Sequence, residues 1–170
     1  SGDEEGVESQ DAESEDLRDH LLWQLNLTPL SAQDRGIATA IIEAINDDGY
    51  LDETNEVICE SLSDLFRASV AQVEAVRHRV QRFDPVGVAS RSLSECLDVQ
   101  LEALDQETPG LAMARKLVSH CLDLLARNDR TRMCQKLKLS DDELDTVIDL
   151  VRSLTPKPGA GYSSAAPEYV

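Results

Sequence analysis

Apolar residues recur along most of the chain at intervals of three and four, the period of an amphipathic α-helix. Leu17, Leu21 and Leu25 form one such stripe. No segment shows the alternation of polar and apolar residues that is typical of a β-strand. The fold class is therefore expected to be all-α, with helices over about 17–27, 32–47, 62–67, 70–83, 93–107, 111–128, a short one from about 131, and 141–154.

Local start and stop signals bound these helices. A serine followed three residues later by Gln or Glu forms a capping box. Such pairs begin three of the predicted helices: Ser69 with Gln72, Ser92 with Glu95, and Ser140 with Glu143. A residue before proline is disfavoured in the α region. Helices are therefore expected to end at Thr28-Pro29, Asp84-Pro85 and Thr155-Pro156.

The helical pattern repeats within the chain. A shift of 71 places residues 69–85 over residues 140–156, matching the cap, the inward apolar positions and the closing proline. A shift of 76 places LRDHLLWQL over LSECLDVQL and matches Gln24 with Gln100. Two copies of one plan are indicated, each with two helices, a helix-turn-helix unit and a proline. Chance agreement between helices that share a period is the alternative.

The chain is expected to form two small helical subdomains packed on one another, each a helical pair plus a helix-turn-helix-like unit. The predicted organisation is a disordered acidic tail, an N-terminal subdomain, a joint loop, a C-terminal subdomain and an extended Pro/Gly-rich tail, over residues 1–16, 17–84, 85–91, 92–154 and 155–170. The start Ser1-Gly2 without methionine is typical of a protease scar, which predicts a fragment of a longer protein.

The segment FDPVGVASRSLSECLDVQL, residues 83–101, joins the two copies. Asp84-Pro85 ends one helix, Gly87 permits a backbone conformation closed to other residues, and Ser92 begins the next helix. We interpret the segment as a structural joint, and a ligand site is the alternative. Packing between the two halves is expected to use Phe83, Pro85, Val86, Leu93, Cys96 and Leu97.

Charge narrows the classes of partner. The chain has 16 basic and 33 acidic residues, for a formal net charge of −17. Eight of the acids lie within residues 1–16, which contain no base and too little apolar surface to fold. The remainder is still acidic, whereas affinity for DNA comes largely from Lys and Arg that neutralise phosphates. A basic protein surface is therefore the favoured partner.

No motif for catalysis or for a cofactor is recognisable. The sequence has no phosphate-binding glycine loop and no Ser, His and acid constellation. Cys59, Cys96, Cys121 and Cys134 form no Cys-x-x-Cys pair, which predicts reduced thiols and a cytoplasmic location. No apolar run reaches the roughly 18 residues of a membrane span. We expect a non-enzymatic monomer without cofactor, metal or membrane association.

Two basic clusters leave a DNA-contacting transcription module as the alternative function. One cluster is expected on the solvent side of the helix over 70–83, and the other surrounds the turn before residue 141. The residues that could contact DNA or a partner are Arg77, Arg79, Arg82, Arg127, Arg130, Arg132, Lys136 and Lys138. Direct DNA reading is the less favoured hypothesis, because the helix that would enter the groove begins with Asp141, Asp142 and Glu143, which would face phosphates.

Three separated segments resemble one family. IIEAINDDGYL, FDPVGVASRSLSECLDVQL and LTPKPG occur in this order between Leu17 and Val170. They are similar to the core-polymerase-binding region of the sigma-54 (nitrogen-type) RNA polymerase sigma factors. Thr155 stands where that family usually has Asn, and Asn46 stands where it usually has Asp.

The resemblance implies a bacterial, cytoplasmic, all-α module that anchors a sigma factor to core RNA polymerase in transcription initiation. The activator-contacting and DNA-binding regions of that family are absent from this sequence, so we expect no direct promoter recognition. The family's signature segment corresponds here to residues that we expect to be mainly structural: Phe83, Asp84, Pro85, Val86, Gly87, Leu93, Cys96, Leu97, Gln100 and Leu101.

An acidic segment is the candidate polymerase-binding surface. Residues 47–64 contain seven acids and no base. We expect these carboxylates to meet a basic surface of core polymerase, where complementary charge raises the association rate and fixes orientation. The alternative for these residues is a loop that is exposed to solvent but binds no partner. For the whole chain, a purely structural spacer is a further alternative. The seven are Asp47, Asp48, Asp52, Glu53, Glu56, Glu60 and Asp64.

Trp23 does not belong to the stripe of Leu17, Leu21 and Leu25. It is expected to be either a lid over the edge of the core or an exposed contact residue.

Overall fold

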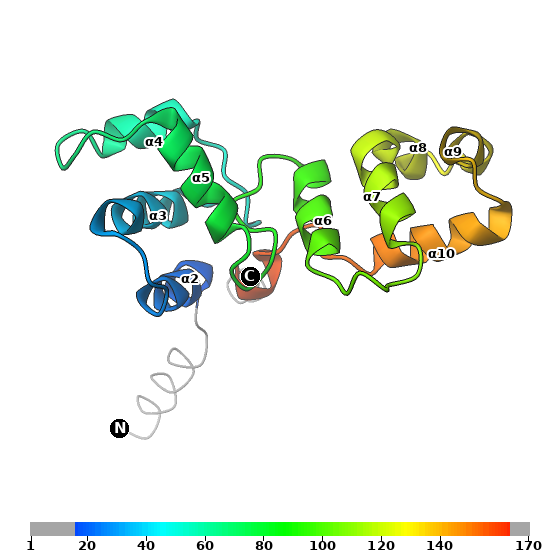
Figure 1. Cartoon of the computed structure of the whole chain (residues 1–170), viewed down its shortest axis with the longest axis horizontal. Coiled ribbons are helices and arrows are strands. Elements are labelled where there is room, and N and C mark those ends of the chain that lie inside the picture. The colour runs from blue at the N-terminus through cyan, green and yellow to red at the C-terminus, as the bar shows by residue number, and fades with distance from the viewer. Residues whose placement is uncertain (1–15, 164–170) are drawn as a thin grey trace, which may run out of the picture. The chain divides into compact units, whose positions relative to one another are not determined.

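The computed structural model describes residues 16–163, so the predicted acidic tail lies outside the described residues except for Asp16. Within this range the regular secondary structure is helical, apart from an isolated antiparallel bridge between Ile45 and Leu51 (Figure 1). The all-α prediction is confirmed. The helices are α2 (Leu17–Asn26), α3 (Ala32–Ala44), α4 (Asn55–Ser61), α5 (Val70–Val80), α6 (Leu93–Glu102), α7 (Leu111–His120), α8 (Leu122–Ala126), α9 (Arg130–Leu137), α10 (Asp141–Arg152) and α11 (Ala160–Ser163).

The chain folds into two compact units. The first unit contains the described residues up to Ala89 together with those from Lys157 onward, and the second unit is Ser90–Pro156. In the first unit α3 packs against α2 and α5, and α4 packs against α5. In the second unit α7 packs against α6 and α10, and α9 packs against α8 and α10.

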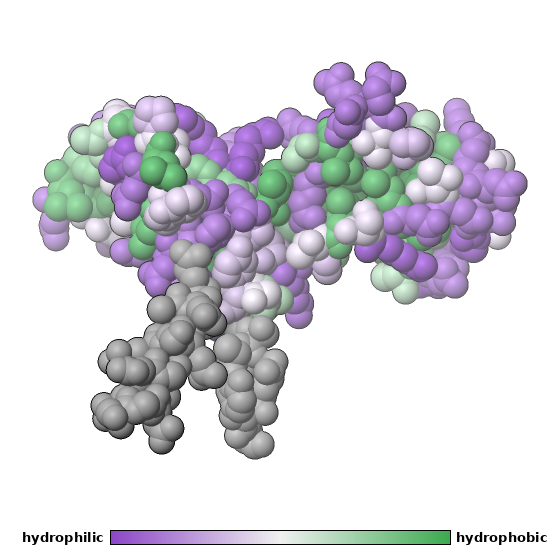
Figure 2. Space-filling model, turned by 90° about the horizontal axis from the view of Figure 1, so that it is seen from below, coloured by the Kyte–Doolittle hydropathy of each residue, from purple (hydrophilic) through white to green (hydrophobic). Residues whose placement is uncertain are grey.

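Each unit buries its own core of aliphatic side chains. The apolar stripes predicted from the helical period supply both cores, because residues three or four apart lie on one face of a helix. The largest buried side chains of the first core include Leu21, Leu25, Ile37, Ile41 and Ile58. Those of the second include Leu101, Leu117 and Met133. Polar residues cover much of the surface seen in Figure 2, with apolar patches between them.

Two of the three predicted capping boxes are confirmed. The boxes that begin at Ser69 and Ser140 are complete, with reciprocal side-chain and backbone hydrogen bonds. Ser92 also caps its helix by accepting from the amide of Glu95 at 3.1 Å. The Glu95 carboxylate, however, accepts from the amide of Arg91. The third predicted box is therefore only half formed, because the chain before α6 presents a different amide to the carboxylate.

The short helix predicted over residues 62–67 is wrong. The helix in this region is α4, seven residues earlier, and it begins at the N-cap Thr54, whose side chain accepts from the amide of Val57. Ile58 and Leu62 point into the first core, while Leu65 is 76% exposed. The apolar pair Leu62 and Leu65 therefore does not form one buried face, and tertiary packing places the helix at the capped segment instead.

The single long helix predicted over residues 111–128 is also wrong. The α-helical conformation breaks at Cys121, which has φ −128° and ψ 12°, so that α7 and α8 are separate. Neither proline nor glycine occurs at the break. Cys121 is fully buried in the second core together with Leu117 and Leu124. The break therefore coincides with a buried core position and not with a helix-breaking residue.

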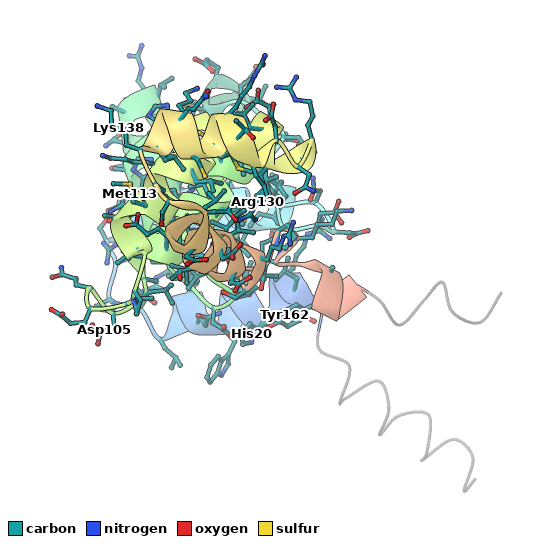
Figure 3. The ribbon with its side chains drawn as sticks, turned by 90° about the vertical axis from the view of Figure 1, so that its right-hand side faces the viewer. His20, Asp105, Met113, Arg130, Lys138 and Tyr162 are labelled. Atoms are coloured by element: carbon teal, nitrogen blue, oxygen red, sulfur yellow. The ribbon has the colours of Figure 1, made fainter. Side chains whose placement is uncertain are left out.

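The segment predicted as an extended tail over 155–170 folds back in its described part. Gly159 donates from its amide to the carbonyl of Asp48 at 2.9 Å, and α11 follows directly. The ring of Tyr162 stacks on that of His20 with centroids 5.5 Å apart, and Figure 3 shows the two side chains close together. The extended-tail prediction is wrong for 155–163, since two glycines, Gly49 and Gly159, let distant backbones approach closely.

The turn that contains Asp48 and Gly49 holds two distant parts of the first unit. The amide of Ala89 donates to the carbonyl of Gly49 at 2.8 Å, and the amide of Gly159 donates to the carbonyl of Asp48. The places where the chain leaves the first unit and returns to it are therefore held by consecutive carbonyl groups.

Candidate protein-interaction site

The acidic segment lies on the surface of the first unit. All seven carboxylates that were predicted as a binding surface are exposed. Asp47 and Asp48 lie in the turn after α3, Glu56 and Glu60 lie on α4, and Asp64 follows α4. One unit thus presents every candidate acid from a continuous stretch of chain, including Asp52 and Glu53.

Hydrogen bonds order the start of this segment. Asn46 accepts through its side-chain oxygen from the amides of Asp48 and Tyr50, both at 3.0 Å. Its side-chain nitrogen donates to the carboxylate of Asp52 at 2.9 Å. Gly49 supplies the positive φ of 100° that the turn requires. The first acids therefore project from a fixed turn, which lowers the conformational entropy lost when a partner binds.

The signature segment begins with a side-chain clamp on its aspartate. The amide oxygen of Gln24 accepts from the backbone N–H of Asp84 at 2.8 Å, and its nitrogen donates to the Asp84 carbonyl at 2.5 Å. His20, one turn earlier on α2, lies 3.0 Å from the Asp84 carboxylate. Asp84 precedes Pro85, so it cannot continue α5, and Gln24 satisfies the backbone groups that a longer helix would have paired.

The second unit contains the same clamp. The amide oxygen of Gln100 accepts from the backbone N–H of Thr155 at 2.8 Å, and its nitrogen donates to the Thr155 carbonyl at 2.8 Å. Gln24 and Gln100 are the pair matched by a shift of 76, and each clamps the residue before a closing proline. A chance coincidence of helical periods does not produce identical four-atom pairing, so this geometry supports an internal duplication.

The remaining signature residues take up separate positions. Phe83 packs against the first core, whereas Leu97 and Leu101 belong to the second. Pro85 and Val86 are half-buried, Gly87 is buried with φ 102° and Cys96 is fully buried, while Leu93 is 43% exposed. Phe83, Leu97 and Leu101 are each assigned to the core of their own unit, so the expected packing between the two halves stays a prediction.

Arg77 was predicted on the solvent side of its helix, and this prediction is wrong. Its side chain is 2% exposed and donates to the carbonyl of Ala89 at 2.9 Å and to the carboxylate of Glu74 at 2.6 Å. The carbonyl of Ala89 is brought to α5 by the loop after Pro85, which gives the guanidinium a buried acceptor. Arg77 therefore holds the joint loop and is removed from the candidate contact residues.

Lowering the pH is expected to protonate Glu74 and weaken its ion pair with Arg77. The Arg77 guanidinium lowers the pKa of the Glu74 carboxyl chiefly through their hydrogen bond, against a smaller opposing effect of burial. Because the folded-state pKa of Glu74 is lowered, its carboxylate stabilises the fold when the pH is above the unfolded-state pKa. This stability is lost as the pH falls through the folded-state pKa. An NMR titration should give a pKa for Glu74 below 4.5 in the native chain, and a value at or above 4.5 would contradict the expectation.

The other candidate bases are exposed to different degrees. Arg79 and Arg82 are exposed on the first unit. In the second unit carboxylates lie beside three arginines: Arg127 pairs with Asp123, Arg130 with Asp141 and Asp145, and Arg132 with Asp129. Lys136 donates to the carbonyl of His120, and Lys138 is exposed. Phosphates would have to compete with these carboxylates, which weakens the case for DNA binding.

Other positions follow from the structure alone. Trp23 is 58% exposed and lies beside the His20 ring, so it does not cover the core. None of the helices within residues 16–163 is long and apolar enough to cross a bilayer. The clamp glutamines were matched by the shift of 76, and that match was the available signal for their common role. The burial of Arg77 had no comparable signal in the sequence.

Comparisons with known proteins agree with the resemblance. The family model described as "Sigma-54 factor, core binding domain" matches residues 6–170. A protein of Pseudomonas putida named RNA polymerase sigma-54 factor is 46% identical over 156 residues, covering 92% of this chain and 31% of that protein. The protein of the same name from Azotobacter vinelandii is 47% identical over 156 residues, with coverage of 92% and 31%. That of Escherichia coli K12 is 45% identical over 154 residues, with coverage of 91% and 32%.

The chain spans about a third of the length of the curated relatives that it matches. The match to the family nevertheless extends over almost all of this chain, including both units, the joint loop and the acidic segment. The chain therefore belongs to the family of sigma-54 factor core binding domains.

Proposed function

We propose that this domain anchors a sigma factor of the sigma-54 type to core RNA polymerase in the bacterial cytoplasm, in the initiation of transcription. It acts by binding as a monomer, without catalysis, cofactor or direct recognition of promoter DNA. Membership of the core-binding family supports the choice of partner. The single structural observation that carries the proposal is the exposed run of seven carboxylates over residues 47–64, which includes no base.

The proposed contact uses complementary charge. A fixed acidic surface attracts a basic surface of the polymerase over a distance set by the screening length, about 10 Å at 0.1 M salt. Such attraction mainly raises the association rate and fixes orientation. The pairing of Arg127, Arg130 and Arg132 with carboxylates supports the absence of direct promoter binding.

The experiment is a fluorescence anisotropy titration of the labelled chain with bacterial core RNA polymerase, with a promoter duplex titrated in parallel. We expect saturable binding to the polymerase and none to the duplex. Binding to DNA alone, with a steep dependence on salt, would contradict the proposal and favour phosphate contacts by the basic residues.

Reversing three acids should weaken binding to core polymerase. Asp47→Lys, Glu60→Lys and Asp64→Lys in one chain are expected to lower the affinity at low salt about tenfold, chiefly through slower association. A matched variant with Glu107→Lys, Asp142→Lys and Asp149→Lys makes the same change of net charge on the second unit and should bind almost as the native chain does. Equal affinities for both variants in the anisotropy titration would rule out the acidic segment as the contact.

A further inference from the structure

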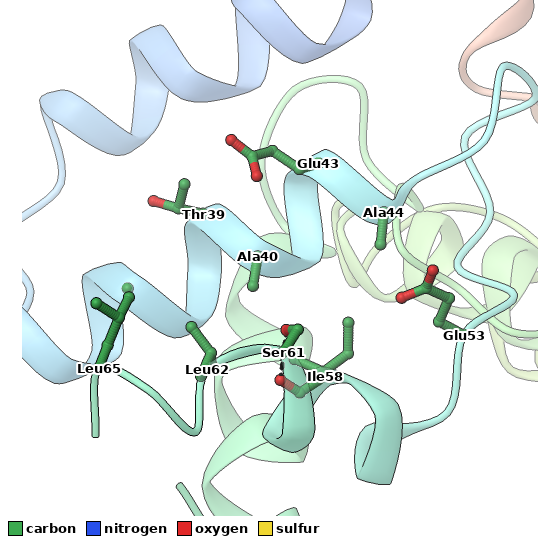
Figure 4. Close-up of a pocket in the computed structure, with 10 residues that line it drawn as sticks. Thr39, Ala40, Glu43, Ala44, Glu53, Ile58, Ser61, Leu62 and Leu65 are labelled. Atoms are coloured by element: carbon green, nitrogen blue, oxygen red, sulfur yellow. Dashed lines mark hydrogen bonds between the residues drawn. The ribbon is translucent and has the colours of Figure 1, made fainter. Parts of the chain in front are cut away.

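A groove in the first unit lies between α3 and the stretch from Glu53 to Leu65, which contains α4 (Figure 4). Its volume is about 480 Å³. Gly36, Ala40 and Ala44 form one wall, since they are spaced one helical turn apart on α3. Ile58 and Leu62 line the opposite side, where they are only 1% and 5% exposed because they belong to the first core. Ala40 and Ala44 present only methyl groups to the groove, whereas the missing side chain of Gly36 makes room for the Phe66 ring, 3.0 Å from where its Cβ would lie.

One large apolar side chain that lines the groove is exposed. Leu65 lines it and is 76% exposed, the highest value among the exposed large apolar side chains of the described residues. Gly36 and Ala44 are eight residues apart, which corresponds to about 12 Å along a helix. This length suits about two turns of a helix or a short extended segment.

The charge around the groove is negative. Glu43 and Glu53 lie toward the end that is farther from Leu65 (Figure 4). Glu60 and Asp64 adjoin the lining residues Ser61 and Leu65 in the sequence. Arg35 likewise adjoins Gly36, but its guanidinium donates to the carbonyls of Leu25 and Thr28. None of the ten described residues that line the groove is basic. A partner with a matching surface would therefore combine apolar side chains with Lys or Arg.

We propose that this groove receives a short amphipathic segment of core RNA polymerase whose apolar side chains are flanked by Lys or Arg. The inference rests on the proposed function and adds the chemistry of the contact. Leu65, with the half-buried Ala40 and Ala44, covers the apolar side chains, and Glu43 and Glu53 face the basic ones. Apolar burial slows dissociation, while the surrounding carboxylates speed association.

The test measures the affinity of the whole chain for core polymerase at low and at high salt. Leu65→Ser should weaken binding about tenfold, which is the size expected when an exposed apolar side chain becomes buried in the complex. The loss should persist at high salt, because apolar burial is not screened. Glu43→Lys should weaken binding at low salt and recover at high salt. Leu27→Ser is the matched control, since Leu27 belongs to the same unit, is 67% exposed and does not line the groove.

Photo-crosslinking then identifies the occupant. A benzophenone-bearing phenylalanine in place of Ser61, which lines the groove, is irradiated in the complex with core polymerase, and the crosslinked peptide is sequenced. We expect an apolar segment with neighbouring Lys or Arg. A crosslinked segment that is acidic or lacks bases, or equal affinities of Leu65→Ser and Leu27→Ser, would overturn the groove proposal alone. Failure of the unsubstituted chain to bind core polymerase would instead refute the proposed function and, with it, this inference.

Discussion

Arg77→Met is expected to lower the free energy of unfolding of the first unit by about 3 kcal/mol. The guanidinium is almost fully buried and donates to the carbonyl of Ala89, which is itself buried. Methionine can fill part of the volume but cannot donate a hydrogen bond. The substitution therefore leaves a buried carbonyl without this donor and releases the joint loop from α5.

Urea denaturation followed by the fluorescence of Trp23 reports on this effect, because the chain has one tryptophan and it lies in the first unit. Arg79→Met is the matched control, since Arg79 lies two residues further along α5 and is exposed. It should change the stability by less than about 0.5 kcal/mol. Similar unfolding midpoints for the two variants would mean that the buried guanidinium contributes no net stability.

Gly159→Ala is expected to destabilise the first unit by about 2 kcal/mol. A Cβ at this position would lie 2.5 Å from the carbonyl oxygen of Asp47 and 2.8 Å from the amide nitrogen of Gly49. Both neighbours are backbone atoms of the turn that orders the acidic segment, so they cannot move aside as a flexible side chain could. The hydrogen bond from Gly159 to Asp48 should lengthen or break.

Gly161→Ala separates this steric effect from the general effect of replacing glycine. Apart from its chain neighbours and the backbone of its own helix, no atom lies within 4 Å of a Cβ built on Gly161. Alanine there should leave the stability unchanged or raise it slightly, because it restricts the unfolded chain. Urea denaturation of both variants measures the difference, and a Gly159→Ala chain as stable as the Gly161→Ala chain would contradict the close approach seen here.

Elements with strong local signals were predictable from the sequence. The α5 and α10 helices each begin at a complete capping box, so their first residues follow from neighbouring residues. Their ends do not, since α5 ends at Val80 and α10 at Arg152, before the expected residues 83 and 154. The α4 helix was missed because it lies in a segment rich in acids, and its buried side is set by contacts with α3 and α5. The break at Cys121 has no local signal at all.

Contacts between distant residues were not predictable in the same way. Arg77 lies in a row with exposed His78 and Arg79, and nothing in that row indicates that the carbonyl of Ala89 will meet its side chain. The return of Gly159 to Asp48 crosses more than a hundred residues of sequence, and a Pro/Gly-rich composition usually favours a free tail.

The candidate site shows the same division. The seven acids could be identified and their exposure expected, since clustered carboxylates are rarely buried. The groove beside them depends on where α4 lies against α3, and the sequence placed that helix in the wrong segment. The exposed Leu65 could not be distinguished from a core leucine until the position of α4 was known.

The anchoring of Ala89 and Gly159 on consecutive carbonyls makes the second unit an insertion whose ends enter and leave at one point of the first. Excision of residues 90–156 and their replacement by a short linker would therefore leave the host unit's backbone path intact. A protease cut in the outgoing connection would not release the inserted unit, because the returning connection still tethers it. The second unit is thus a domain insertion within the first, although it repeats the helical plan of the first.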